Sequence, residues 1–290
     1  MSGSTRVFVM TRRVRTPASI VGVTLTAAFV ALAILAHVIA PTDPFASVGY
    51  PLTPPSRAHM FGTDDLGRDL LSGIVHGART SLIATLAVSV IASMVGVAVG
   101  AVAGYRGGAV DDLLMRGTEA VQVVPRFFLA VIVIALFGPG LDRVVFVLGL
   151  TTWPGIARVV RADTLSLVRH EFVDAARALG ATTSRILLRH VLPGALPTAL
   201  VAISLNAASV ILLEAGLGFI GLGDPRAVSL GYLSNNAQRF LRVAWWMALF
   251  PGAAIALAVL GLNLVGDALS DLADPRRRRL GVRPPGAGWP

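Results

Sequence analysis

Long apolar segments constrain the fold of this chain more than any other feature of its sequence. A helix needs roughly 20 residues to cross a bilayer. Six segments approach that length: 18–40, 80–104, 117–137, 141–160, 197–222 and 245–267. Only 14% of the residues are charged, whereas an ordinary soluble domain has about 25%. The sequence therefore predicts an all-α, polytopic membrane protein with six transmembrane helices.

The first apolar segment is expected to remain as a membrane anchor. It follows arginines at positions 12, 13 and 15 and has 23 residues. The apolar part of a cleavable signal peptide has only about 7–15. We therefore expect 18–40 to be an uncleaved first transmembrane helix.

Two glycine patterns predict how the helices pack and connect. Gly96, Gly100 and Gly104 follow one another at a spacing of four in the second span, and this spacing lets another helix backbone approach closely. The residues at 138–140 read Gly-Pro-Gly, which is typical of a tight turn. The third and fourth spans are therefore expected to form a hairpin.

Arginine is expected to set the orientation, because cytoplasmic loops carry an excess of basic residues. With the N-terminus in the cytoplasm, 17 arginines fall on the cytoplasmic side and seven on the other. This predicts a cytoplasmic N-terminal tail (1–17), an extracytoplasmic segment (41–79), a core with five further transmembrane helices (80–270) and a cytoplasmic C-terminal tail (271–290). The loop at 161–195 then also faces the cytoplasm.

Missing or badly spaced residues exclude several chemistries. The chain has neither lysine nor cysteine, so it cannot form a standard P-loop or a thiolate metal site. Its five histidines are never three or four residues apart. The GxGxxG match at 216–221 closes an apolar span, where no dinucleotide fold is expected. Arginines gather at the ends of apolar segments, which argues against nucleic acid as a partner. We expect no enzyme activity, no metal and no cofactor in this chain.

Glu214 and Arg126 place charged groups inside apolar spans, where an ionised side chain is costly. One interpretation assigns both residues to a translocation pathway, in which they line the path or pair with each other. The alternative is structural: Glu214 is hydrogen-bonded between packed helices, and Arg126 extends toward the membrane interface, as does Glu119. The sequence leaves both interpretations open.

The loop at 161–195 is basic and amphipathic. Residues 174–179 are predicted to form a short helix that stops at Gly180. Residues 184–191 are predicted to form a second short helix, which Pro193 ends. Two short helices joined by a glycine form a compact knob. By composition alone, such a pair is also typical of an amphipathic hairpin at a membrane interface.

Here the sequence resembles a known family, the binding-protein-dependent ABC transporter permeases. Their EAA…G…LP loop is similar to Asp174-Ala175-Ala176, Gly180 and Leu192-Pro193. More specifically, the chain resembles the C-type subunit of dipeptide, oligopeptide and nickel importers over about 55–275. Six further stretches carry this resemblance: FGTDDLGRD (61–69), GYRGG (104–108), WPG (153–155), RHVLP (189–193), EAGLGFIGLG (214–223) and NLVGD (263–267).

The resemblance implies a permease subunit of the bacterial plasma (inner) membrane that forms a pathway for peptides or related cargo such as nickel chelates. It implies as partners a homologous second permease, two ATP-binding subunits that hold the ATP, an extracytoplasmic substrate-binding protein and membrane lipid. It also implies that the loop couples to the ATPase subunits through Asp174, Ala175, Ala176, Leu179, Gly180, Leu192 and Pro193.

Some residues depart from the family pattern. Asp174 replaces the usual glutamate, His190 stands at the generic isoleucine position, and Gly194 replaces a common asparagine. The sequence at 224–226 is Asp-Pro-Arg where a double proline is more frequent, which leaves the cargo open. The rival hypothesis is a self-sufficient secondary transporter or channel that uses Glu214. Six spans without an obvious inverted repeat argue against it.

Overall fold

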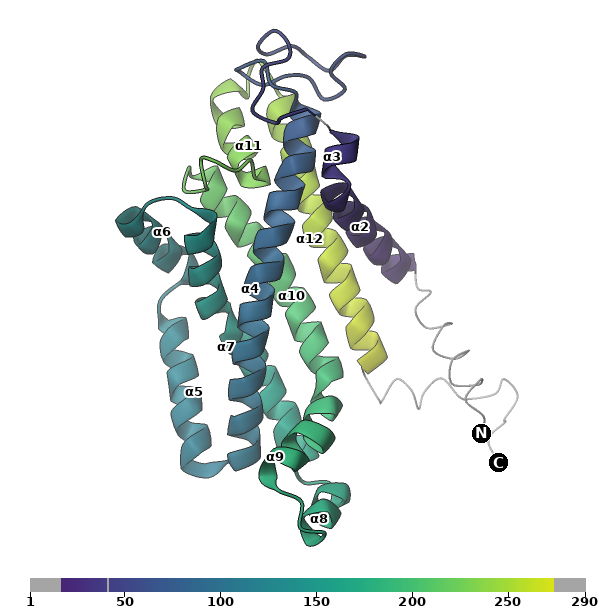
Figure 1. The fold of residues 1–290 in the computed structure, drawn as a ribbon, viewed down its shortest axis with the longest axis vertical. Coiled ribbons are helices and arrows are strands. Elements are labelled where there is room, and N and C mark those ends of the chain that lie inside the picture. Colours follow the sequence, from purple (N-terminus) through teal and green to yellow (C-terminus); the bar gives the residue numbers. More distant parts are fainter. Residues whose placement is uncertain (1–16, 41, 274–290) are drawn as a thin grey trace, which may run out of the picture.

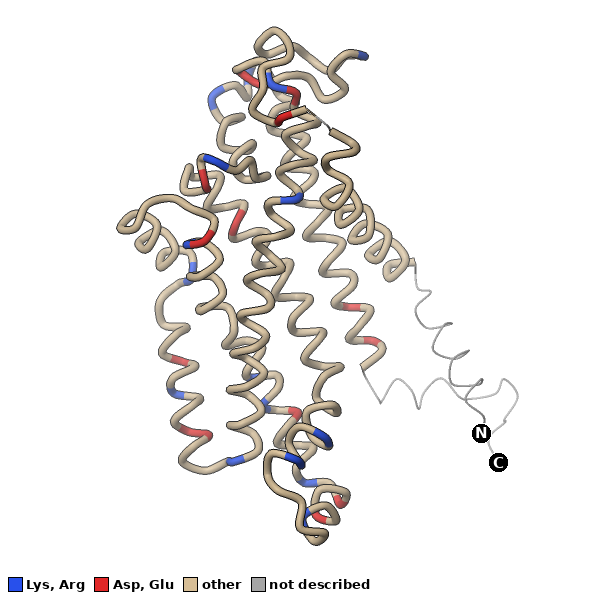
Figure 2. Tube along the Cα trace, in the orientation of Figure 1, with Lys and Arg blue, Asp and Glu red and all other residues tan. Residues whose placement is uncertain are grey.

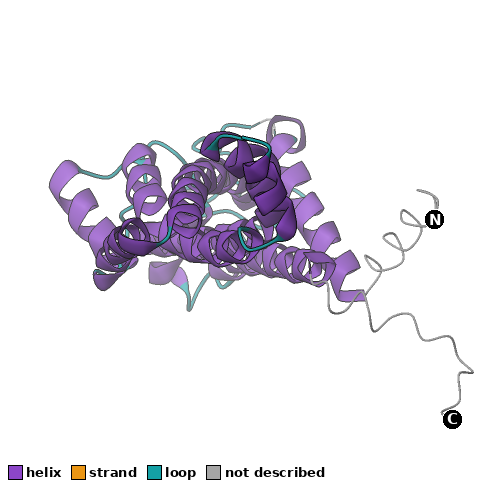
Figure 3. Cartoon of the chain, turned by 90° about the horizontal axis from the view of Figure 1, so that it is seen from below, coloured by secondary structure: helices purple, strands orange, loops and turns teal. Residues whose placement is uncertain are grey.

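The computed structural model describes residues 17–40 and 42–273. In this part of the chain the regular structure is helical, apart from two isolated backbone bridges between 47 and 69, and Figure 3 shows the helices gathered into one bundle. The all-α prediction is therefore confirmed. The expected tails lie almost wholly outside the described residues.

The helices follow one another along the chain with short connections, except for the long segment 42–69 (Figure 1). Their bounds are α2 Pro17–Ile34, α3 Ala36–Ile39, α4 Leu70–Arg106, α5 Gly108–Val123, α6 Arg126–Phe137, α7 Leu141–Leu167, α8 Glu171–Ala178, α9 Thr183–Ile186, the π turn η1 Leu187–Val191, α10 Leu192–Phe219, α11 Leu230–Ala237, the 3₁₀ turn η2 Gln238–Phe240 and α12 Trp246–Ala273.

Five helices are long and apolar enough to cross a membrane, and α5 with α6 makes a sixth span if this bent pair is counted as one. A continuous helix over 117–137 is therefore a wrong prediction, because the chain bends by 69° between α5 and α6. Pro125 lies at the bend and disfavours a helical backbone at Val124, which is extended with ψ 122°. The sixth span is broken rather than straight.

Two other helices extend well beyond their predicted bounds. Helix α4 begins at Leu70, inside the segment expected to lie outside the membrane, because Asp69 caps it by accepting a hydrogen bond from the Ser72 backbone N–H at 2.8 Å. Helix α7 continues to Leu167 and so includes the first residues of the 161–195 loop. The short helix α11, between α10 and α12, has no counterpart in the sequence prediction.

Helices α4 and α7 pack closely along the glycine row predicted from the sequence. A Cβ atom would lie 2.9 Å from the Trp153 carbonyl oxygen if added to Gly96, and 2.9 Å from the Val160 Cβ if added to Gly100. At Gly104 it would lie 2.7 Å from the Arg161 carbonyl oxygen. The glycines therefore allow near-backbone contact along the second half of α7, from Trp153 to Thr164.

A second glycine contact joins the first span to the last. A Cβ added to Gly22 in α2 would lie 3.0 Å from the Leu264 carbonyl carbon in α12, and one added to Gly261 would lie 2.9 Å from the Thr26 hydroxyl oxygen. Figure 1 shows α2 beside α12. The two ends of the described chain thus pack together.

Segment 42–69 covers one end of the bundle. Phe61 stacks on Phe250 with ring centroids 4.2 Å apart, and the Trp246 indole N–H donates to the Thr63 carbonyl at 3.2 Å. The Asp64 carboxylate accepts hydrogen bonds from the backbone N–H groups of its own loop. Burial raises the pKa of Asp64, and these hydrogen bonds partly oppose the rise. We call this side of the molecule the loop end.

The knob formed by residues 168–191 lies at the opposite end, which we call the α8 end (Figure 1). Charged residues are frequent near the two ends and along α5, whereas α2 and long stretches of α4 and α10 carry none (Figure 2). This distribution is that of a bundle whose middle lies in hydrocarbon.

Because α4 and α7 are in close contact, replacing a glycine by alanine should destabilise the protein at that contact but not at an open position. Gly100→Ala overpacks that contact and should lower the free energy of unfolding by about 1–3 kcal/mol. The control is Gly155→Ala on α7, where a Cβ meets nothing within 4 Å. Unfolding of the purified chain by SDS titration measures both variants. Equal stability of the two would contradict the close approach.

Candidate functional site

The knob begins with α8 and turns at Gly180. The His170 backbone is extended before the helix, and Gly180 has φ +78° after it. The Ala181 N–H donates to the Ala176 carbonyl at 3.0 Å and the Gly180 N–H to the Arg177 carbonyl at 2.9 Å. The predicted short helix and glycine stop are therefore present, and a side chain at Gly180 would be strained by its positive φ.

A small apolar core fixes the knob to the membrane helices. Val173, Ile186 and Val191 are fully buried, with Tyr105 from α4 and Leu167 from α7 packed against them. The Arg177 guanidinium also lies 5.9 Å from the centroid of the Tyr105 ring. Because its base is packed in this way, a force applied to α8 is transmitted to α4 and α7.

The structure separates the predicted coupling residues of α8 into two groups. Asp174, Ala175 and Leu179 are exposed, and the exposed fraction of Leu179 is 88%. Ala176 is half-buried against the core of the knob. Phe172, which the sequence analysis did not single out, is 43% exposed beside them. The outer face of α8 is thus apolar although its side chains are exposed. Packing within this chain therefore does not account for the apolar side chains on that face.

The second helix of the knob does not end at Pro193, contrary to the prediction. The chain runs from α9 through the π turn η1 into α10 without interruption. Pro193 lies in the first turn of α10, where its missing N–H is tolerated. The π turn widens the hydrogen-bond spacing, as in the bond from the Leu192 N–H to the Leu187 carbonyl. Leu192 and Pro193 therefore lie where the knob becomes a membrane helix.

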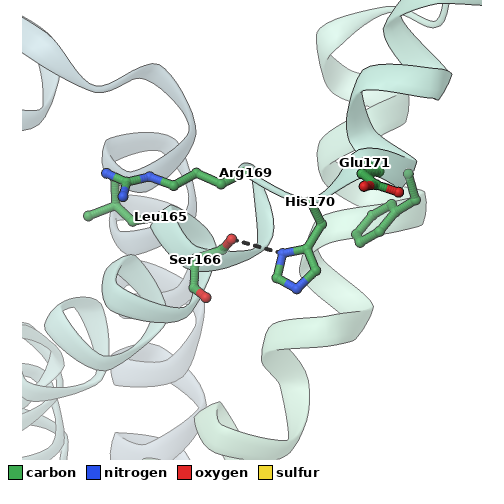
Figure 4. Close-up of a pocket in the computed structure, with 6 residues that line it drawn as sticks. Leu165, Ser166, Arg169, His170 and Glu171 are labelled. Carbon is green, nitrogen blue, oxygen red and sulfur yellow. Dashed lines mark hydrogen bonds between the residues drawn. The ribbon is translucent and has the colours of Figure 1, made fainter.

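An open groove of about 860 Å³ lies where α7 passes into α8 (Figure 4). Its lining residues are Leu165, Ser166, Arg169, His170, Glu171 and Phe172. The His170 Nδ1–H donates to the Ser166 carbonyl at 3.0 Å, which orients the ring. The groove combines a cation, a carboxylate and an aromatic ring on an exposed surface. It is open to solvent and does not have the enclosed, mostly apolar shape of a typical small-molecule pocket.

Glu214 is buried where α10 meets α4 and α11. Its carboxylate accepts a hydrogen bond from the Ser81 hydroxyl at 2.8 Å, and the Ser229 side chain lies nearby. Ser229 also caps α11 by accepting from the Tyr232 N–H at 3.2 Å. Glu214 thus joins α10 to α4 through the Ser81 hydroxyl, beside the start of α11.

Arg126 lies half-buried at the start of α6. Among the described residues, no ion pair joins it to Glu214. The hydrogen bond of Glu214 therefore matches the structural alternative, and a role on the pathway stays a prediction. In the same part of the chain, no group of three or more histidines, aspartates or glutamates could hold a metal ion.

Substitutions at Glu214 should separate its hydrogen bonding from its charge. Glu214→Gln keeps an acceptor for the Ser81 hydroxyl and should unfold like the parent chain in an SDS titration. Glu214→Leu leaves that buried hydroxyl without a partner and should cost roughly 1–3 kcal/mol. Ser81→Ala should lower the free energy of unfolding less in the Glu214→Leu variant than in the parent chain. Additive losses would show that Ser81 and Glu214 do not interact.

Comparisons with known proteins place this geometry in a family. Residues 96–279 match the family described as binding-protein-dependent transport system inner membrane component. A dipeptide transport system permease of Alkalihalophilus pseudofirmus is 36% identical over 266 residues, which cover 90% of this chain and 86% of that protein. A di/tripeptide transport system permease of Pseudomonas aeruginosa is 37% identical over 252 residues, covering 84% of this chain and 83% of that protein.

A solved structure shares the fold. The MetNI methionine ABC transporter in an inward-facing conformation matches with a TM-score of 0.57 at 20% identity, over 70% of this chain and 96% of that one. The family match spans the knob and the four spans around it, and the relatives extend it toward the first span. The chain therefore belongs to the family of binding-protein-dependent transport system inner membrane components.

Proposed function

We propose that this chain is one of two permease subunits of an ATP-driven peptide importer. With a homologous second permease, it forms the translocation pathway. Two separate subunits bind and hydrolyse ATP, and an extracytoplasmic binding protein delivers the cargo. Family membership supports the importer assignment, and the relatives named for dipeptide and di/tripeptide transport support the cargo class. The absence of lysine, and so of a standard P-loop, fits an ATPase on other chains.

The apolar outer face of α8 is the observation that carries the coupling proposal. Leu179, Ala175 and Phe172 are exposed on a helix whose opposite face is buried in the knob. An exposed apolar face on a rigid base is typical of a docking element. We infer that it sits in a groove of an ATPase subunit. ATP-driven closure of the ATPase dimer then moves α8 and, through α7 and α10, the membrane helices.

The proposed orientation places the α8 end in the cytoplasm of a bacterium and the loop end outside it. The arginine excess on the α8 side of the membrane supports this orientation. The ATPase needs cytoplasmic ATP, so the knob has to face the same compartment. The cargo range, from dipeptides to nickel chelates, depends mainly on the binding protein.

The hypothesis of a secondary transporter that uses Glu214 gains no support from the geometry. A coupling carboxylate has to exchange its proton or ion with water during the cycle. Glu214 is only 4% exposed and accepts a hydrogen bond from the buried Ser81 hydroxyl. Such a carrier also leaves the apolar face of α8 without a purpose.

The docking face predicts which charge substitutions uncouple the importer. Leu179→Asp should lower ATPase retention or peptide import several-fold, because burying an unpaired carboxylate in a docking groove is costly. Ala178→Asp is the matched control, since Ala178 is exposed near Asp174 on the polar side of α8. Reconstituted complexes report ATP hydrolysis, subunit retention and uptake from a mixture of radiolabelled di- to pentapeptides.

Two results would contradict the coupling proposal. One is normal ATPase retention and import by Leu179→Asp, and the other is equal damage by both variants. Ala176→Asp is not informative here, because Ala176 is half-buried in the knob and its substitution also disturbs the base.

The orientation predicts opposite labelling of the two ends. The chain has no cysteine, so any thiol labelling of the chain comes from the one cysteine that is introduced. Tyr50 is 87% exposed at the loop end and Leu179 is 88% exposed at the α8 end. In intact cells that express the chain alone, an impermeant maleimide should label Tyr50→Cys directly and Leu179→Cys only after permeabilisation. The reverse pattern would invert the assignment.

A further inference from the structure

Helix α5 is loosely attached to the bundle. Of its 16 residues, only Asp111 and Thr118 are buried, while Leu113 and Val123 are 71% and 78% exposed. The Thr118 hydroxyl bonds to the Leu114 carbonyl of α5 itself and so contributes no polar contact to a neighbouring helix. Apolar packing alone therefore fixes the position of α5 only weakly.

Neither end of α5 sets its direction firmly. Gly107 precedes it and Gly108 is its first residue, with φ values of 62° and 54°, a backbone region open to glycine. At its other end, the chain bends by 69° around Pro125 into α6. Helix α5 is thus a straight element between two bends.

One ion pair attaches the start of α5 to α7. The Arg161 Nε donates to one Asp111 carboxylate oxygen at 2.5 Å, and a terminal guanidinium nitrogen donates to the other at 2.6 Å. The two side chains are only 33% and 10% exposed. Among ion pairs between described residues, the others join partners no more than ten positions apart. Within the described part of the chain, this bidentate pair is the ion pair that joins two different helices, α5 and α7.

Arg161 lies on the part of α7 that leads into the knob. Its backbone carbonyl faces Gly104 in the close contact between α4 and α7, and α7 ends at Leu167, just before α8. The guanidinium is therefore carried by the rigid pair of helices on which the knob is seated. Any movement of the knob that shifts the end of α7 also shifts the partner of Asp111.

We infer that Asp111 and Arg161 are positioning residues that make α5 follow α7 when the knob moves. This inference rests on the proposed coupling function. The pair stays formed through the cycle, because separating it leaves a largely buried carboxylate without its partner. The guanidinium group is planar and makes two hydrogen bonds to the carboxylate. The pair therefore restricts the orientation of α5 relative to α7, which a single hydrogen bond would not do.

The position of α5 is tested first, on the chain alone in lipid nanodiscs. Spin labels at Leu113→Cys in α5 and Ser166→Cys in α7, both exposed positions, report the distance between these helices. The parent should give a narrow distance distribution and Arg161→Gln a broad one, with the charge-swapped Asp111→Arg/Arg161→Asp chain narrow again. Asp112→Asn removes the neighbouring exposed charge and should leave the distribution narrow. An unchanged distribution in Arg161→Gln would overturn the inference, whatever the coupling proposal's fate.

The consequence for transport is tested in the reconstituted complex, with the same labelled peptide mixture. Arg161→Gln should retain the ATPase subunits and hydrolyse ATP but lose import per ATP several-fold, and the charge swap should restore it. The double variant Asp111→Cys/Arg161→Cys should import poorly before treatment. A short bis-maleimide that cross-links its two thiols should then restore import by the same protein sample. Normal import by Arg161→Gln, or a block by the cross-link, would refute the inference. Loss of the ATPase subunits from the unsubstituted complex would instead contradict the coupling proposal.

Discussion

Hydrogen bonding of the backbone is the constraint on which this structure depends. Inside a bilayer no water can satisfy an exposed N–H or C=O group, so each span has to satisfy its own as a helix. At the bend around Pro125, the break between α5 and α6 is short, so few backbone groups lose their helical partners there. Packing among the spans then depends on close contact, which the glycines of α4 supply.

The knob and the α4–α7 contact form one mechanical unit in the proposed cycle. The apolar core of the knob joins α8 to α4 and α7, and the π turn continues it into α10. A movement at the surface of α8 thus reaches three membrane helices without passing through a flexible linker. At the other end, the contacts of Phe61 and Thr63 with α12 hold segment 42–69 in place.

The sequence predicted those features that depend on local pattern. Apolar length identified the spans, the glycine spacing identified the face of α4 that meets another helix, and Gly180 identified the turn of the knob. The two prolines were harder to interpret, because Pro125 lies at a break between two helices whereas Pro193 lies inside a continuous helical run, after the π turn. The partners of Glu214 and Arg161 could not be predicted, since serines and aspartates far along the chain carry no signal of proximity.

The contact between α2 and α12 has a consequence for how the protein is made. Helix α2 is synthesised first and α12 last, yet Gly22 and Gly261 fit each other's helices. During translation, the glycine face of α2 therefore stays without this partner until the helices between α2 and α12, and α12 itself, have been made. A chain truncated before α12 leaves the glycine face of α2 without this partner.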